Sequence, residues 1–210
     1  METILIYISL IGSLTLAISG ALKAINKKFD PFGVLIIGFV TAVGGGTIRD
    51  ILLTEKTVFW LTATTYLYFI LGGAIIAIIF RDKLNKFNKS LLLFDAIGLG
   101  LFTITGVQIG IDNDLHFINC IISGTVTGSF GGVLRDISVN ETPVIFKKEI
   151  YATVSIIGGC IYFVLLKFNI QNPIQQIIPI ILIIIARIII LRFNISLPQI
   201  KYRQKDSEEI

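Results

Sequence analysis

The chain has 210 residues, of which 54% are hydrophobic and 15% are charged, and its mean hydropathy is +0.84. A soluble domain of this length carries about a quarter charged residues, so the composition excludes an ordinary soluble protein and indicates that lipid surrounds most of the chain. The formal net charge is +4, and the two cysteines, Cys120 and Cys160, lie in apolar runs without the spacing of a disulfide framework or a metal site.

Seven apolar stretches are long enough to cross a bilayer, which takes about 20 residues. The first starts directly after the N-terminus and lacks the basic region of a secretory signal, so we expect it to stay attached as a membrane helix. The connections between stretches are short and leave little of the chain outside the membrane. In chain order the predicted spans are residues 4–24, 32–53, 58–80, 91–111, 117–138, 150–168 and 174–192.

Lysine and arginine are distributed unequally between the two sides on which seven spans place the loops. Lys56 and Lys167 lie on one side, and three arginines lie within the spans. The positive-inside rule then predicts an inner (plasma) membrane protein with its N-terminus outside and its C-terminus in the cytoplasm. The basic residues of the cytoplasmic side are Lys23, Lys27, Lys28, Arg81, Lys83, Lys86, Lys89, Lys147, Lys148, Arg192, Lys201, Arg203 and Lys205.

The chain matches itself without a gap when it is shifted by 86 residues, with 20 identities between residues 11–80 and 97–166. Glycines and charged residues recur, including Arg49-Asp50 at Arg135-Asp136, and apolar bias alone would not align these. An odd number of spans in each copy makes the second copy enter the membrane from the opposite side, as in many transport proteins. The sequence therefore predicts an all-α membrane protein with seven transmembrane helices, two inverted three-helix repeats plus a seventh helix.

This organisation divides the chain into four predicted parts. Residues 1–89 form the first three-helix repeat and residues 90–168 the second, inverted one. Residues 169–198 contain the seventh transmembrane helix, and residues 199–210 form a solvated cytoplasmic tail.

The middle helix of each repeat carries a glycine run beside an Arg-Asp pair. Consecutive glycines are poor helix interiors, so we expect a kink or an unwound stretch at membrane depth, where freed carbonyls would favour a cation. The alternative is close helix packing, because the glycines also fit a small-xxx-small pattern. The candidate pathway residues are Thr41, Gly44, Gly45, Gly46, Thr47, Arg49 and Asp50 in the first repeat and Thr127, Phe130, Gly131, Gly132, Arg135 and Asp136 in the second.

The charged pairs are costly near the membrane interior, which points either to a polar pathway or to structural ion pairs. Because neighbouring helix residues do not face each other, we expect pairing across the repeats, Arg49 with Asp136 and Arg135 with Asp50. Asp95 and Gln108 are further candidates for the pathway, with simple contact to the interface as the alternative.

Three segments, residues 44–50, 95–102 and 131–136, together resemble the bacterial branch of the TRIC family, the trimeric intracellular cation channels and their prokaryotic relatives. The resemblance runs from the first helix to about Phe168. It implies a homotrimer in membrane lipid, a pore in each subunit lined by the kinked second and fifth helices, and permeation of monovalent cations, chiefly potassium with sodium as the other candidate. It places the permeant ion near Gly44, Gly45 and Gly46 and near Gly131 and Gly132. Phe130 replaces the first glycine of the second triplet, which implies a stiffer kink or a narrower pore.

Two other functions stay open beside the potassium channel. A secondary transporter of a small solute such as glycine would suit inverted repeats with broken helices equally well, and a structural membrane protein without flux would leave the buried charges unexplained. The sequence has no nucleotide-binding lysine motif, nucleophile elbow, histidine-rich metal set or nucleic-acid cluster. We therefore expect no enzymatic activity, no cofactor, no resident metal and no nucleic-acid partner.

Overall fold

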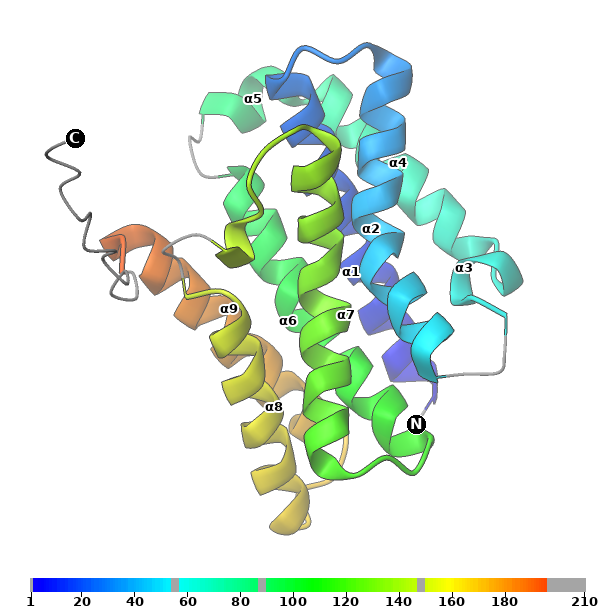
Figure 1. Cartoon of the computed structure of the whole chain (residues 1–210), viewed down its shortest axis with the longest axis vertical. Coiled ribbons are helices and arrows are strands. Elements are labelled where there is room, and N and C mark those ends of the chain that lie inside the picture. The colour runs from blue at the N-terminus through cyan, green and yellow to red at the C-terminus, as the bar shows by residue number, and fades with distance from the viewer. Residues whose placement is uncertain (1, 54–56, 87–89, 147–149, 196–210) are drawn as a thin grey trace, which may run out of the picture.

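The computed structural model of the protein describes residues 2–53, 57–86, 90–146 and 150–195. Within these ranges the secondary structure is helical (Figure 1), in agreement with the predicted all-α class, while the predicted tail of residues 199–210 lies outside the described residues. In chain order the elements are α1 (Glu2–Asn26), α2 (Pro31–Leu53), α3 (Phe59–Thr62), α4 (Thr65–Ile79), α5 (Arg81–Lys86), α6 (Ser90–Asp112), α7 (Phe117–Ser138), the 3-10 turn η1 (Val144–Phe146), α8 (Ala152–Lys167) and α9 (Ile174–Phe193).

Five of these helices are long and apolar enough to cross a membrane: α1, α2, α6, α7 and α9. Two further apolar helices are shorter, α4 with 15 residues and α8 with 16. Large apolar side chains cover the outward faces, as lipid requires. On α9, for example, the exposed ones are Ile174, Ile177, Ile181, Leu182, Ile185, Ile188, Ile189 and Phe193.

The helix ends agree closely with the predicted spans except at the third one. There the chain breaks at Ala63, which has extended backbone angles, so that the predicted span 58–80 becomes the single turn α3 followed by α4. One hydrogen bond holds the start of α3 in place: the backbone N–H of Phe59 donates to Asp50 Oδ2 in α2 at 2.9 Å. Asp50 thus draws the start of α3 against the end of α2.

Several helices end in the same left-handed turn. Asn140, Asn169 and Asn194 have φ between 50° and 55°, a conformation that asparagine tolerates better than most residues, and Lys28 and Asp114 adopt it as well. In each case the following N–H closes the helix by bonding back to the last turn, for example Glu141 N to Asp136 O at 2.8 Å. These turns make the short connections that pack successive helices antiparallel.

Four helices, α1, α2, α6 and α7, pack together at the centre of the bundle (Figure 1). Helix α4 covers α1 and α2 on one side, and α8 and α9 cover α6 and α7 on the other. The ends of α2 and α7 define the two ends of the bundle. We call the end that holds Arg49 the Arg49 end and the end that holds Arg135 the Arg135 end.

Candidate ion pathway

The glycine runs do not interrupt their helices. Helix α2 is continuous from Pro31 to Leu53 and α7 from Phe117 to Ser138, and no glycine among the described residues has a positive φ. The prediction of an unwound stretch was therefore wrong, and with it the expectation of freed carbonyls that would hold a cation. The alternative, close packing of helices, is what the glycines serve.

Helices α2 and α7 cross in direct backbone contact at two glycines. A side-chain carbon added at Gly45 would collide with the carbonyl oxygen of Thr127, and one added at Gly131 would collide with the carbonyl oxygen of Thr41. Both obstacles are main chain, which cannot swing away as a side chain can. We call this contact the glycine crossing, defined by Thr41, Gly45, Thr127 and Gly131.

The other candidate residues of the glycine runs surround this crossing. Gly44 packs against the side chain of Leu134, and Gly46 lies under the ring of Phe59. The remaining positions are less enclosed or face polar groups: Thr47 Oγ1 accepts a hydrogen bond of 3.1 Å from Trp60 Nε1, Phe130 is partly exposed, and Gly132 lies beside the hydroxyl of Tyr151.

The threonine hydroxyls at the crossing bond to their own helices. Thr41 Oγ1 donates to the carbonyl of Ile37 and Thr127 Oγ1 to that of Ser123, each at 2.6 Å. Both side chains are almost completely buried. The protons are thus used inside each helix, which leaves the hydroxyl oxygens as acceptors at the crossing.

At the Arg49 end, Arg49 pairs with its own neighbour. Its Nη2 lies 2.6 Å and its Nε 2.8 Å from Asp50 Oδ1, and both side chains are less than a tenth exposed. The guanidinium also lies over the ring of Phe59, at 5.7 Å from the centroid. Burial of this pair is tolerable because each charge has its partner and further contacts.

At the Arg135 end, Arg135 binds two carboxylates at once. Its Nη1 lies 2.6 Å from Asp95 Oδ1 in α6, and its Nε lies 2.9 Å from Asp136 Oδ1. The same Nη1 donates to Ser19 Oγ in α1 at 3.0 Å. All four side chains are about 1% exposed or less, so three helices are joined here by a fully buried ionic cluster, the Arg135 cluster.

The expected pairing across the repeats was therefore wrong. Through the glycine crossing α2 and α7 run antiparallel, which puts residue 49 opposite residue 123, and Arg49 and Ser123 do line one cavity. Asp136 stands 13 residues further along α7, about 20 Å of helix rise away. Each arginine instead binds the adjacent aspartate. Adjacent residues point in different directions from a helix, but the long arginine side chain is flexible enough to reach back.

Two cavities flank Arg49. One, of about 230 Å³, is lined by Arg49 with Ser9, Tyr66 and Thr105, among mostly apolar neighbours from α1, α4 and α6. The other, of about 220 Å³, lies on the opposite side between α2 and α7, where Arg49, Asn119 and Ser123 are its polar lining residues. Arg49 thus lines two cavities at the Arg49 end.

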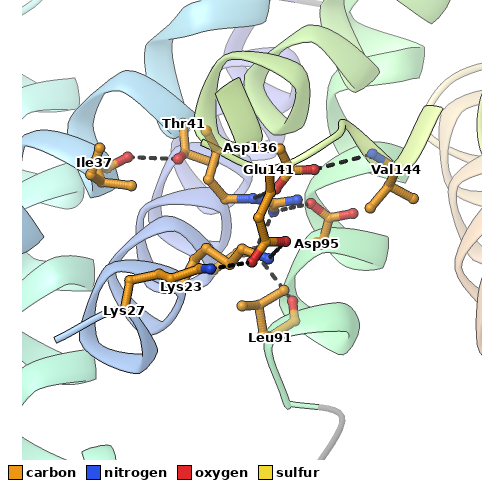
Figure 2. A network of polar contacts seen from close by, with 11 residues as sticks. Lys23, Lys27, Ile37, Thr41, Leu91, Asp95, Asp136, Glu141 and Val144 are labelled. Atoms are coloured by element: carbon orange, nitrogen blue, oxygen red, sulfur yellow. Dashed lines mark hydrogen bonds and ion pairs between the residues drawn. The ribbon is translucent and has the colours of Figure 1, made fainter. Parts of the chain in front are cut away.

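A second ionic contact at the Arg135 end was not predicted. The carboxylate of Glu141 lies between two ammonium groups of α1, 2.7 Å from Lys23 Nζ and 2.8 Å from Lys27 Nζ (Figure 2). Hydrogen bonds from Lys23 and then Lys27 lower the pKa of Glu141 to about 2. The signal was present in the sequence, because Glu141 follows α7 directly and the expected topology puts that turn on the same side as the two lysines.

The other polar candidates lie away from the crossing. Gln108 Nε2 donates to Asp112 Oδ1 at 2.9 Å in its own helix, and Gln108 Oε1 accepts from the Tyr162 hydroxyl in α8. Arg187 in α9 is fully buried, and its Nη1 donates to the carbonyl of Ile150 at 2.8 Å.

Comparison of the sequence with known proteins shows the family to which the chain belongs. A family model described as "Glycine transporter" matches the chain in two segments, residues 6–82 and 92–167. The UPF0126 membrane protein of Deinococcus radiodurans is 41% identical over 155 residues, 73% of this chain and 72% of that protein. The UPF0126 inner membrane protein YadS of Escherichia coli is 34% identical over 194 residues, covering 91% of this chain and 94% of that protein.

A solved structure agrees in fold and in sequence. The TRIC trimeric intracellular cation channel orthologue from Rhodobacter sphaeroides superimposes with a TM-score of 0.86 at 32% identity, covering 92% of this chain and the whole of that one. The chain belongs to the prokaryotic branch of the TRIC family. The two segments that match the family model, residues 6–82 and 92–167, contain both the glycine crossing and the Arg135 cluster.

Proposed function

We propose that the protein is a monovalent cation channel, permeable to potassium, with a pore inside each subunit. The observation that carries this proposal is the placement of two buried Arg-Asp pairs at opposite ends of the glycine crossing. Ionisable groups at membrane depth are expensive and mark ion pathways when they face the interior of a bundle. The similarity to a TRIC cation channel points the same way.

The pore would run along α2 and α7 between the two pairs, bordered by α1 and α6. Thr41, Gly44, Gly45, Gly46 and Thr47 on α2 and Thr127, Phe130, Gly131 and Gly132 on α7 would form its narrow part. The carboxylates of Asp50, Asp95 and Asp136 would attract the cation, because each adds negative charge in a medium of low dielectric constant. Unbroken helices make these carboxylates, and not freed backbone, the groups that face a permeant ion.

We also propose seven spans in two inverted three-helix units, α1–α2–α4 within residues 1–89 and α6–α7–α8 within residues 90–168, followed by α9. Equivalent contacts support the symmetry. Gly12 packs on Phe102, and Gly98, its counterpart 86 residues later, packs on Leu16, the counterpart of Phe102. The family model also matches the chain twice, with starts 86 residues apart at residues 6 and 92.

The symmetry reveals one difference between the ends. The shift of 86 residues aligns Asp95 with Ser9 and Ser19 with Thr105, so the groups around Arg135 have counterparts around Arg49. Ser9 and Thr105 lie 3.4 Å apart and line the cavity beside Arg49. At the Arg135 end the carboxylate of Asp95 binds the arginine, whereas at the Arg49 end the equivalent residue is Ser9, whose hydroxyl lines a cavity.

From this difference we infer a closed gate at the Arg135 end. The bonds from Arg135 to Asp95 and Ser19 tie α7 to α6 and α1. Opening would require the Arg135–Asp95 pair to separate, which would expose a carboxylate to the pathway. The Arg49 end would be the open vestibule, with Arg49 held aside by Asp50.

The distribution of basic residues supports an orientation in the membrane, and a solved relative supports an assembly. Lys23, Lys27 and the basic loops of the Arg135 end would lie in the cytoplasm by the positive-inside rule, with the N-terminus outside. The gate would then face the cytoplasm. A homotrimer is proposed by analogy with the trimeric relative from Rhodobacter sphaeroides.

A glycine transporter is the alternative, and it is not favoured: the matching family is described as "Glycine transporter", but the solved structure that the chain resembles is that of a cation channel. The two functions differ in a planar bilayer. Purified protein under a potassium chloride gradient is expected to give discrete current steps that reverse near the potassium equilibrium potential. A silent bilayer together with saturable uptake of labelled glycine into liposomes would overturn the channel and favour the transporter.

A further inference from the structure

A second polar site lies away from the proposed pore, at the turn between α8 and α9. Residues 169–176 contain five carboxamide side chains and no charged residue, in the order Asn169, Gln171, Asn172, Gln175 and Gln176. A cavity of about 670 Å³ opens here at the Arg49 end of the bundle. It is lined by four of these amides and by Ile4, Leu166 and Ile170. We call it the amide pocket.

Two amide atoms at this pocket are buried without a hydrogen-bond partner. Gln175, which lines the pocket, is only 4% exposed, and its Nε2 donor is unpaired. The Oδ1 acceptor of Asn172, a second lining residue, is unpaired as well. Orphaned buried amides are costly, since each loses its water without a replacement, so such a group in a folded protein calls for a partner.

The unpaired atoms specify the chemistry of that partner. They are one donor, the Nε2 group of Gln175, and one acceptor, Asn172 Oδ1. A ligand with both a cationic or hydroxyl donor and an anionic acceptor would satisfy both kinds at once. The lining itself has no side chain to neutralise a net charge, which disfavours an ionic ligand of one sign.

The surroundings specify where the partner comes from. The pocket joins the ends of two apolar helices, α8 and α9, where Leu166, Phe168 and Ile174 are exposed. Its apolar wall of Ile4, Leu166 and Ile170 continues onto these faces. In a membrane protein such faces meet lipid chains, and the helix ends meet the headgroup layer.

We propose that the amide pocket binds the headgroup of a zwitterionic phospholipid, with phosphatidylethanolamine as the probe that fits it. The ammonium group donates to Asn172 Oδ1, and the phosphate accepts from the Nε2 group of Gln175. The glycerol and upper acyl chain lie along Ile4, Leu166 and Ile170. This site is independent of the glycine crossing and does not depend on the proposed channel activity.

Native mass spectrometry of the full-length protein, stripped of lipid and titrated with phosphatidylethanolamine or phosphatidylglycerol, tests the proposal. Wild type is expected to retain phosphatidylethanolamine preferentially, and Gln175→Leu and Asn172→Leu are expected to weaken this binding about tenfold each, the effect of one lost hydrogen bond to a charged group. Asn113→Leu, an exposed amide substitution at the end of α6, serves as the matched control and is expected to bind as wild type does.

Thermal unfolding keeps the test decisive if a variant is poorly stable. Without lipid, Gln175→Leu is expected to unfold in one cooperative transition; added phosphatidylethanolamine is expected to raise the wild-type unfolding midpoint more than that of the variant. Equal binding of both lipids, or equal gains in midpoint, would overturn the proposal. So would a change in oligomer mass in the leucine variants, because the amides would then bind a second copy of the chain.

Discussion

The carboxylate of Asp95 lies 2.6 Å from the guanidinium of Arg135, and both side chains are about 1% exposed. Arg135 also binds Asp136 and Ser19, so the cluster joins α1, α6 and α7 inside the bundle. At the Arg49 end, Arg49 binds Asp50, and Ser9 occupies the position that the shift of 86 residues gives to Asp95. This difference between two otherwise similar ends underlies the first of the following predictions.

Introducing the missing acid should close the Arg49 end. Ser9→Asp places a carboxylate in the cavity beside Arg49, where an ion pair like that of Asp95 with Arg135 can form. We expect single-channel current to fall at least about tenfold, the effect of roughly 1.4 kcal/mol in favour of the closed state. Ser9→Asn, of the same size and without charge, is the control and should conduct better than Ser9→Asp. Equal currents in the two variants would show that charge at this position does not act on the pathway.

Alanine should not be tolerated at the glycine crossing. Gly45→Ala and Gly131→Ala each force a methyl group against the backbone of the facing helix, and we expect a loss of about 1–3 kcal/mol of stability or more. The unfolding midpoint in detergent, followed by fluorescence, measures the loss.

Gly72→Ala is the control for these two variants, because a side-chain carbon at Gly72 in α4 meets nothing within 4 Å. It should leave stability unchanged or raise it by up to about 1 kcal/mol, the difference in helix propensity. If Gly45→Ala and Gly72→Ala had the same midpoint, the tight contact of α2 with α7 would be refuted.

The contact of Glu141 with Lys23 and Lys27 should make stability depend on pH in acid. The folded-state pKa of about 2 lies below the ordinary value of 4.5, so the stabilisation is fully present above pH 4.5 and is lost as the pH falls towards 2. Glu141→Gln is therefore expected to be less stable than wild type at pH 7, by about 1 kcal/mol or less for a partly exposed pair.

Unfolding midpoints of both proteins between pH 7 and pH 2 measure this effect. The difference between wild type and Glu141→Gln should shrink below pH 4.5. A difference that stayed constant down to pH 2.5 would mean that the carboxylate contributes through its shape and not through its charge.

The sequence predicted the long helices well because each is an apolar run bounded by polar turns. The predicted spans 91–111 and 117–138 differ from α6 and α7 by at most one residue at each end. The third span was less accurate, since a hydrogen bond from Phe59 to Asp50 breaks it near Ala63, and that contact is tertiary.

The sequence identified many residues of the candidate site but not which of them contact each other. Glycines suit both a broken helix and a close crossing, so composition could not separate the two, and only the packing of Gly45 on Thr127 does. The expected inversion of the two copies makes α2 and α7 antiparallel, which puts Arg49 and Asp136 at opposite ends of the bundle, so the predicted pairing of Arg49 with Asp136 was inconsistent with it. Asp95 was named from the sequence as a candidate for the pathway, while its partner Arg135 could be assigned only in three dimensions.

Removing the acid from the Arg135 cluster should also weaken the fold. Asp95→Asn takes one of two carboxylates from a buried guanidinium, and breaking such a pair costs about 3–5 kcal/mol. Asp136 still binds Arg135, so we expect the lower part of this range in a denaturation experiment. A cost near zero would indicate that water reaches the cluster and screens it.

Single-channel recording of Asp95→Asn beside wild type, in a planar bilayer with a potassium chloride gradient, tests the proposed gate most directly. If the Arg135–Asp95 pair holds the cytoplasmic end closed, the variant will open more often than wild type, by about tenfold or more, with the same reversal potential near that of potassium. An open probability equal to that of wild type, with channels of both proteins clearly resolved, would contradict a gate at this pair.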